Sequence, residues 1–270
     1  MIGFFDSGFG GLTILKEVEK LLPEYSYIYL GDNARAPYGS KSSTEIYEHT
    51  VAGVEELFRQ GADLIVLACN TASAVALRKI QQELLPTKYP GKKVLGIIFP
   101  TAEEADKFSQ TKQICLWATE MTVQSNAYPA EIIKIDPEVS LTQLACPLFV
   151  PLIETGEITG AKLESIINEY IRQTIELNPQ TDTVVLGCTH YAIIEAEIRR
   201  LLPFKIKLVT QGQIVAKKLK QYLSNHPEIE TELDRESKKV FLTTKKSAQV
   251  KRLTELFYGQ PVDLKSVKGR

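Results

Sequence analysis

The chain has 270 residues, a hydrophobic fraction of 44%, a charged fraction of 24% and a formal net charge of −1. This composition is typical of a globular protein with a sizeable core, and the near-zero charge excludes a chain-wide basic field for nucleic acid or an anionic membrane. The chain opens on a strand-like segment without a leader pattern, and it contains neither a transmembrane-length apolar run nor a CxxC pair. We therefore expect a cytoplasmic protein with reduced thiols and no metal site.

Short apolar runs alternate with amphipathic stretches along most of the chain. Strands are predicted at 2–5, 27–30, 64–68, 94–98, 114–118, 184–187 and 207–209. Helices are predicted at 12–21, 43–59, 72–84, 101–108, 121–133, 162–176, 193–202 and 213–223. The strands are rich in Val, Ile and Leu without alternation, which favours an α/β fold with doubly wound parallel sheets. Ligands of such folds bind beyond the carboxyl ends of the strands.

An internal repeat surrounds two cysteines. Residues 63–72 read DLIVLACNTA and residues 182–191 read DTVVLGCTHY, so Cys69 and Cys188 follow matching apolar runs. A single buried cysteine is usually a small hydrophobic residue, but two with matched flanks indicate two equivalent thiols around one ligand. The repeat predicts two pseudo-symmetric domains, residues 1–97 with 208–270 and residues 98–207, with the active site in the cleft between them.

The remaining cysteines, Cys115 and Cys146, lack these flanks and are expected to be structural. Each repeat thiol is expected to precede a helix, whose N-terminus would favour the thiolate and direct backbone amides at an anion. His190, two residues beyond Cys188, is expected to share or orient a proton, and Asp6 could serve Cys69 in the same way.

Other motifs also follow predicted strands. FDSGFGG (5–11) contains Asp6 and Ser7, which would face the cleft or cap a helix; a nucleotide loop is disfavoured because neither GxGxxG nor a Walker pattern is present. GDNARAPYGSKS (31–42) predicts a loop that exposes amides and the phenol of Tyr38. WATEMTVQSNAY (117–128) contains Thr119 and Thr122, which as readily cap a helix, and VPLIETGE (150–157) contains Glu154.

Taken in order from Ile2 to about Ala216, these motifs resemble those of glutamate racemases in the cofactor-independent aspartate/glutamate racemase superfamily. The resemblance implies interconversion of L-glutamate and D-glutamate without a cofactor, a supply of D-glutamate for peptidoglycan, and a homodimer. It implies that Cys69 deprotonates D-glutamate with help from Asp6. It implies that Cys188 deprotonates L-glutamate with help from His190 and a nearby carboxylate, Glu154.

The resemblance also assigns substrate-contacting positions. These are Asp6, Ser7, Pro37, Tyr38, Gly39, Ser40, Asn70, Thr71, Thr119, Thr122, Thr189 and His190. The chain departs from the family pattern at Ala192, where a proline is usual, and at Thr210-Gln211-Gly212, where many members have an Asp.

Three alternatives stay open. The chain could act on aspartate or another substrate of the same superfamily. It could be a redox protein with a Cys69–Cys188 disulfide, or a binding protein that has lost its activity.

Overall fold

The computed structural model describes residues 1–267, in which ten strands form two parallel sheets. The six-stranded sheet contains β1 (Ile2–Asp6), β2 (Tyr27–Gly31), β3 (Leu64–Leu67), β4 (Lys93–Gly96), β9 (Lys239–Thr243) and β10 (Leu264–Ser266). The four-stranded sheet contains β5 (Gln113–Ala118), β6 (Ser140–Ala145), β7 (Thr183–Gly187) and β8 (Lys207–Val209). The predicted α/β class with parallel sheets is confirmed.

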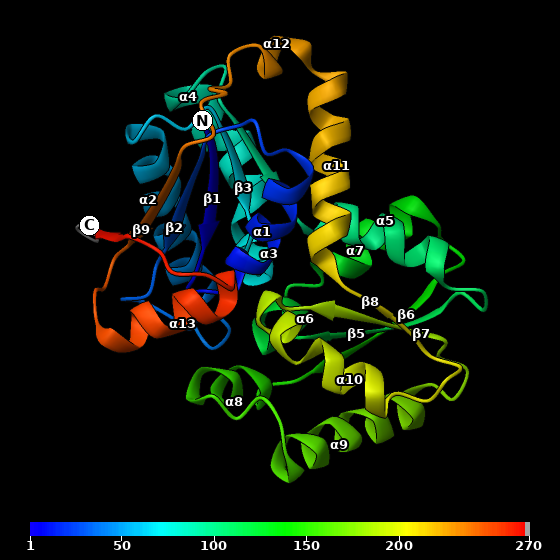
Figure 1. Cartoon of the computed structure of the whole chain (residues 1–270). Helices are drawn as coiled ribbons and strands as arrows, with labels where there is room; N and C mark the ends of the chain where they lie inside the picture. Colours follow the sequence, from blue (N-terminus) through cyan, green and yellow to red (C-terminus); the bar gives the residue numbers. More distant parts are fainter. Residues whose placement is uncertain (268–270) are drawn as a thin grey trace.

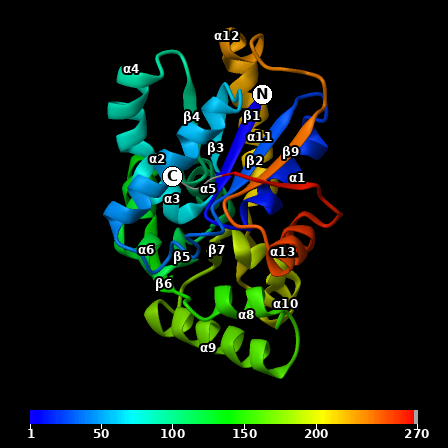
Figure 2. The same ribbon diagram turned by 90° about the vertical axis from the view of Figure 1, so that its left-hand side faces the viewer.

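Helices surround both sheets (Figures 1 and 2). Those that follow strands of the first sheet are α1 (Gly11–Leu21), α2 (Ser43–Arg59), α3 (Asn70–Lys79), the π-helical turn η1 (Ile80–Leu84), α4 (Leu85–Lys88), α5 (Ile98–Phe108) and α13 (Ala248–Tyr258). Those that follow strands of the second sheet are α6 (Glu120–Gln124), α7 (Ala127–Ile135), α8 (Phe149–Thr155), α9 (Ala161–Leu177), the 3-10 helix η2 (Thr189–Ile194), α10 (Glu195–Leu201), α11 (Gln211–Asn225) and α12 (Pro227–Glu230).

The two sheets share one strand order. The first four strands are arranged β2-β1-β3-β4, and the next four are arranged β6-β5-β7-β8. Cys69 follows β3 and Cys188 follows β7, so each thiol stands after the third strand of its set. The order reverses between the first and third strands of each set, which is where open α/β sheets bind ligands. The internal repeat of the sequence therefore corresponds to equivalent places in the two sheets.

The C-terminal part of the chain returns to the first sheet. β9 pairs with β2, and β10 extends the same edge. α11 runs from the second sheet back along α1, against which it packs (Figure 1). β8 crosses the predicted domain boundary between residues 207 and 208, and the division into domains stays a prediction.

Several predicted helices are interrupted. Residues 121–133 form α6 and α7, which are separated by Asn126 in the left-handed region (φ 52°). Residues 193–202 divide between η2 and α10, and residues 72–84 end in the π-helical turn η1. The edge strand β6 was missed because its residues are only partly buried and lack a continuous Val/Ile/Leu run.

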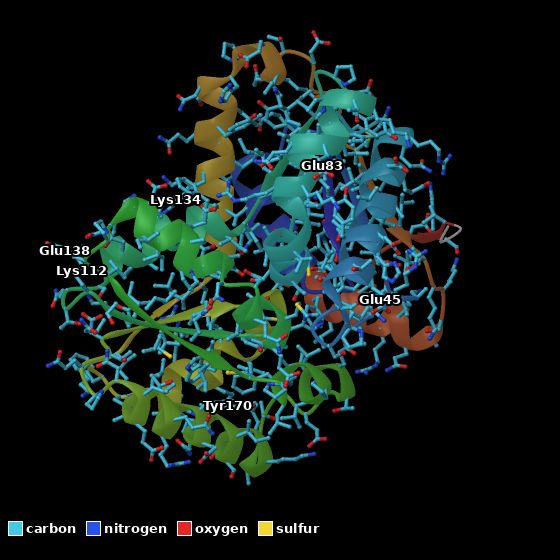
Figure 3. All side chains as sticks on the ribbon, turned by 180° about the vertical axis from the view of Figure 1, so that it is seen from behind. Glu45, Glu83, Lys112, Lys134, Glu138 and Tyr170 are labelled. Carbon is cyan, nitrogen blue, oxygen red and sulfur yellow. The ribbon has the colours of Figure 1, made fainter. Side chains whose placement is uncertain are left out.

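Charged side chains lie on the outer helix faces, where Lys and Glu alternate. Glu83 and Lys134 are exposed examples (Figure 3). Such solvated faces account for the balanced composition without a charged binding surface. Within residues 1–267, no helix combines the length and apolarity needed to cross a membrane.

The packing of α2 on β1 depends on Gly53. A Cβ atom built at this position would overlap the ring of Phe5, which is fully buried on β1. Glycine is normally unfavourable inside a helix, and replacement by alanine stabilises exposed helices by about 1 kcal/mol. At Gly53 the overlap outweighs that preference.

We expect Gly53→Ala to lower the free energy of unfolding by about 1–3 kcal/mol, because the added methyl group forces α2 away from the sheet. Urea denaturation followed by circular dichroism measures the change. Phe5→Leu removes the ring atoms that the methyl group meets, so the cost of Gly53→Ala should be smaller in that background. An unchanged or higher midpoint for Gly53→Ala in the parent would contradict this packing.

Candidate functional site

The carboxyl ends of four central strands lead into one buried junction between the sheets. Asp6 ends β1, Cys69 follows β3, Thr119 follows β5 and Cys188 follows β7. Two helices that follow central strands are in direct contact at the junction, since Thr13 Oγ1 in the first turn of α1 donates to the carbonyl of Thr189, the first residue of η2, at 3.4 Å. The segment after Asp6 and the segment after Cys188 therefore meet in a single site.

The loop after β1 approaches η2 so closely that one position requires glycine. A Cβ atom at Gly10 would overlap the hydroxyl of Thr189 and lie 2.8 Å from Nδ1 of His190. Gly10 thus serves contact between the two sheets, which is a different use from cradling a phosphate.

Cys69 occupies the N-cap position of α3, as expected. Its Sγ accepts from the amide of Ala72 at 3.5 Å and donates to Ser7 Oγ at 3.4 Å. The predicted effect on its acidity is wrong. Burial and the neighbouring Asp6 carboxylate raise the pKa of the Cys69 thiol to about 12, whereas its hydrogen bonds with Ser7 and Ala72 lower it by less. At neutral pH Cys69 is therefore a protonated thiol.

Asp6 is fully buried beside this thiol. Its Oδ2 accepts from the amide of Gly8 at 2.7 Å, and its Oδ1 has no hydrogen-bond partner among residues 1–267. Burial raises the pKa of Asp6 to about 6, against the opposing charge of His190 and the amides of Gly8 and Gly11. A carboxyl group that titrates near neutrality is suited to accepting and returning a proton.

Cys188 ends its strand as expected, but a 3-10 helix follows it in place of an α-helix. His190 Nε2 lies 3.1 Å from Glu154 Oε1, which α8 contributes. Burial alone would lower the pKa of His190, but hydrogen bonds to Cys188 and Glu154 and the negative charges of Cys188 and Asp6 raise it to about 10. The imidazole is therefore a charged group with both ring nitrogens available as donors.

Helix α13 covers this histidine. The ring of Phe257 packs edge-on against His190 with centroids 5.0 Å apart, and Arg252 Nη2 donates to the carbonyl of Glu154 at 3.3 Å. The C-terminal region, for which the sequence offered no motif, thus helps to close the site. Amphipathic spacing over residues 248–258 was the available signal.

Three predicted threonines form a cluster of hydroxyl groups. Thr71 Oγ1 lies 3.0 Å from Thr119 Oγ1 and 3.3 Å from Thr122 Oγ1, and the last two are 3.0 Å apart. Thr119 also meets the alternative prediction, because it caps α6, whereas Thr122 lies inside that helix and its amide donates to the cap. The loop 31–42 joins this cluster where the amide of Met121 donates to the carbonyl of Gly39 at 3.3 Å.

The phenol of Tyr38 is buried, contrary to the prediction that the loop exposes it. Its hydroxyl donates to Asp32 Oδ2 at 2.7 Å, and Asp32 Oδ1 accepts from Thr244 at 2.7 Å. Asp32, which was not among the predicted site residues, thereby fastens the loop to Thr244, the residue that follows β9. Pro37 and Ser40 lie on the exposed part of the loop, and their predicted contacts with a ligand stay predictions.

A groove of about 760 Å³ runs between α3, α5, α7 and α11, without any of the predicted site residues. A small crevice reaches the predicted site and is lined by Cys188, Thr189, Thr13 and Gln211 among others. All four cysteines are free, and Cys115 and Cys146 are buried in the core of the second sheet as expected.

The contact between Glu154 and His190 predicts a measurable titration. In the parent protein the His190 imidazole should stay protonated to about pH 10. Glu154→Gln removes the anionic partner, so the midpoint should fall by roughly one to three pH units. Nuclear magnetic resonance of the three histidines measures the shift. Glu228→Gln is the matched control, because it removes the carboxylate of the exposed His226–Glu228 pair and should leave the His190 midpoint unchanged. An unchanged His190 midpoint in Glu154→Gln would refute the pairing.

Known proteins share this arrangement. The family model described as Asp/Glu/Hydantoin racemase matches residues 12–219. Glutamate racemase of Streptococcus thermophilus is 34% identical over 98% of this chain and 95% of its own length, and that of Bacillus cereus is 36% identical over 97% and 94%. The crystal structure of Francisella tularensis glutamate racemase with D-glutamate superimposes with a TM-score of 0.87 at 31% identity, covering 99% of this chain and 97% of that one. The chain belongs to the Asp/Glu/Hydantoin racemase family.

Proposed function

We propose that this protein interconverts L-glutamate and D-glutamate by moving the α-proton between two thiols, without a cofactor. The observation that carries the proposal is the pair of buried cysteines at equivalent places in the two sheets, each with its own ionisable partner. Whole-length similarity to glutamate racemases supports glutamate as the substrate.

The two thiols act on opposite faces of the α-carbon. In the direction from L-glutamate, the Cys188 thiolate removes the α-proton and the Cys69 thiol delivers a proton to the other face. The high pKa of Cys69 suits it to the role of donor in this direction. After one turnover Cys188 is protonated and Cys69 is the thiolate, which is the form that removes the α-proton of D-glutamate.

The ionisable partners reset the thiols between turnovers. Asp6, with a pKa of about 6, returns a proton to the Cys69 thiolate when it is protonated and regains that proton from solvent. The positive charge of protonated His190 stabilises the Cys188 thiolate, so the Cys188 thiol can release its proton to solvent after turnover. The two helpers differ in charge because Asp6 is isolated by burial, whereas His190 is held by Glu154. The two halves of the site thus carry equivalent thiols and unlike helpers.

Neutral donors hold the amino acid and stabilise charge that develops at the α-carbon. The hydroxyl groups of Thr71, Thr119 and Thr122 are preorganised by their mutual contacts. The amides at the start of α3 point toward the space next to Cys69. Because the cysteines are nearly covered by protein, water is excluded from the reaction, which strengthens these interactions.

We further propose the cellular setting that the family resemblance implies. The protein supplies D-glutamate for peptidoglycan in the cytoplasm and acts as a homodimer, which light scattering tests. Its two domains comprise residues 1–97 with 208–270 and residues 98–207. Pro37 and Ser40 contact the substrate when the loop closes over it.

The two-thiol mechanism predicts that Cys69→Ser and Cys188→Ser each lose racemisation by roughly 100- to 10,000-fold, because each removes a proton donor and acceptor. Chiral chromatography of both enantiomers measures turnover. Cys115→Ser is the matched control, since this cysteine is equally buried and lies against Thr174 within the second sheet's core. Turnover near the parent level in either single variant would rule the mechanism out.

A substrate panel tests the choice of glutamate. Aspartate, hydantoins and arylmalonates should turn over much more slowly than glutamate in the same assay. Preference for one of these would assign the protein to another activity of the superfamily while leaving the two thiols in place.

A further inference from the structure

Next to Cys69, the side chain of Asn70 is tied into a buried polar network that the mechanism above does not use. Asn70 is the first residue of α3 and is 2% exposed. Its partners are Gln211, the first residue of α11, and Tyr128 on α7. The network therefore joins the segment after the first thiol to two helices that follow strands of the second sheet.

The two amides form a reciprocal pair. Asn70 Nδ2 donates to Gln211 Oε1 at 2.7 Å, and Gln211 Nε2 donates to Asn70 Oδ1 at 3.1 Å. The hydroxyl of Tyr128 donates to the same Asn70 Oδ1 at 2.8 Å. Both lone pairs of that oxygen are thus engaged, whereas the Asn70 nitrogen has used one of its two hydrogens.

Thr101 sets the direction of the whole network. Its hydroxyl donates to the backbone carbonyl of Ile97 at 2.6 Å, so its oxygen can only accept from a neighbour. Gln211 lies 3.0 Å away and must therefore present its NH₂ group to Thr101. This places the Gln211 oxygen toward Asn70, which in turn must present its own NH₂ group. A fixed backbone carbonyl thereby determines the orientation of the Asn70 amide.

Gln211 also stands at the second thiol. It lines the small crevice that contains Cys188. In the same network, burial raises the pKa of Tyr128, and the charge of nearby Cys188 adds to that rise. The network consequently lies between the segments that carry the two cysteines. It is anchored in residues that are nearly inaccessible to solvent: Thr101, Tyr128, Asn70 and Gln211.

We propose that Gln211 is a positioning residue for the substrate, which fixes the Asn70 side chain so that an N–H group, and not an oxygen, remains for the carboxylate of the amino acid. This deepens the proposed function and rests on it. A carboxylate only accepts hydrogen bonds, so a flipped Asn70 amide would turn an attraction into a repulsion. The side chain of residue 211 thus contributes to the affinity for glutamate without contacting the substrate.

The test is a double-mutant cycle. Gln211→Met keeps the side-chain length but removes the amide, so KM for both enantiomers should rise by roughly tenfold, the worth of one buried hydrogen bond. The change in kcat should be smaller than that in KM, since binding rather than proton transfer is affected. In an Asn70→Ala background the same substitution should change KM by less than about twofold, because Gln211 acts through Asn70.

Gln213→Met is the matched control, because Gln213 is an exposed residue of the same helix turn. Its KM should equal that of the parent. Thermal unfolding of each variant separates loss of fold from loss of positioning. Should Gln211→Met fail to fold, Thr101→Val keeps the Gln211 amide but removes the acceptor that orients it, together with the Thr101 hydrogen bond to Ile97, and KM should again rise.

Two results would overturn the inference. In the first, KM for Gln211→Met stays at the parent value. If Thr101→Val has replaced that variant, the same result for Thr101→Val counts. The other is an equal rise in KM with and without Asn70, which is what a purely structural role would give. A parent protein that neither binds nor racemises glutamate defeats the proposed function itself, and this inference with it, whereas an active parent with unaffected variants defeats this inference alone.

Discussion

The site depends on one constraint, the direct approach of the loop after β1 to the turn after β7. Gly10 permits that approach, because any side chain there would occupy the space of Thr189 and His190. The approach brings the ends of two separate sheets together and buries both thiols to within 8% exposure. Burial of both thiols and their partners in one site then influences which of these ionisable groups are charged, and so which can donate or accept a proton.

Burial and helix termini act in opposite directions on the first thiol. The N-terminus of α3 does present an amide to Cys69, but desolvation and the Asp6 carboxylate have the larger effect on its pKa. The second half of the site is organised differently, because Glu154 supplies a charge partner that keeps His190 protonated. In the half of the site around Cys69, burial of Asp6 sets the protonation of the helper. In the half around Cys188, the ion pair between Glu154 and His190 sets it.

A buried polar network lies where the sheets join. The amide of Gln211 there ties Asn70 to Thr101 and Tyr128. The same junction receives α13 through Phe257 and the loop 31–42 through Gly39. Contacts from distant parts of the chain therefore orient the groups around the thiols.

The sequence by itself determined the α/β class, the parallel sheets and the equivalence of the Cys69 and Cys188 segments, because apolar runs, turn residues and a repeated motif are local features of a chain. It also singled out Asp6, His190 and the threonines as candidates, because they stand at or shortly after the ends of strands. Only the tertiary structure decided the pKa of Cys69, the burial of Tyr38, the break at Asn126 and the roles of Gln211 and α13. Each of these depends on neighbours that are far away in the sequence, and local pattern carries no information about how much solvent such neighbours remove.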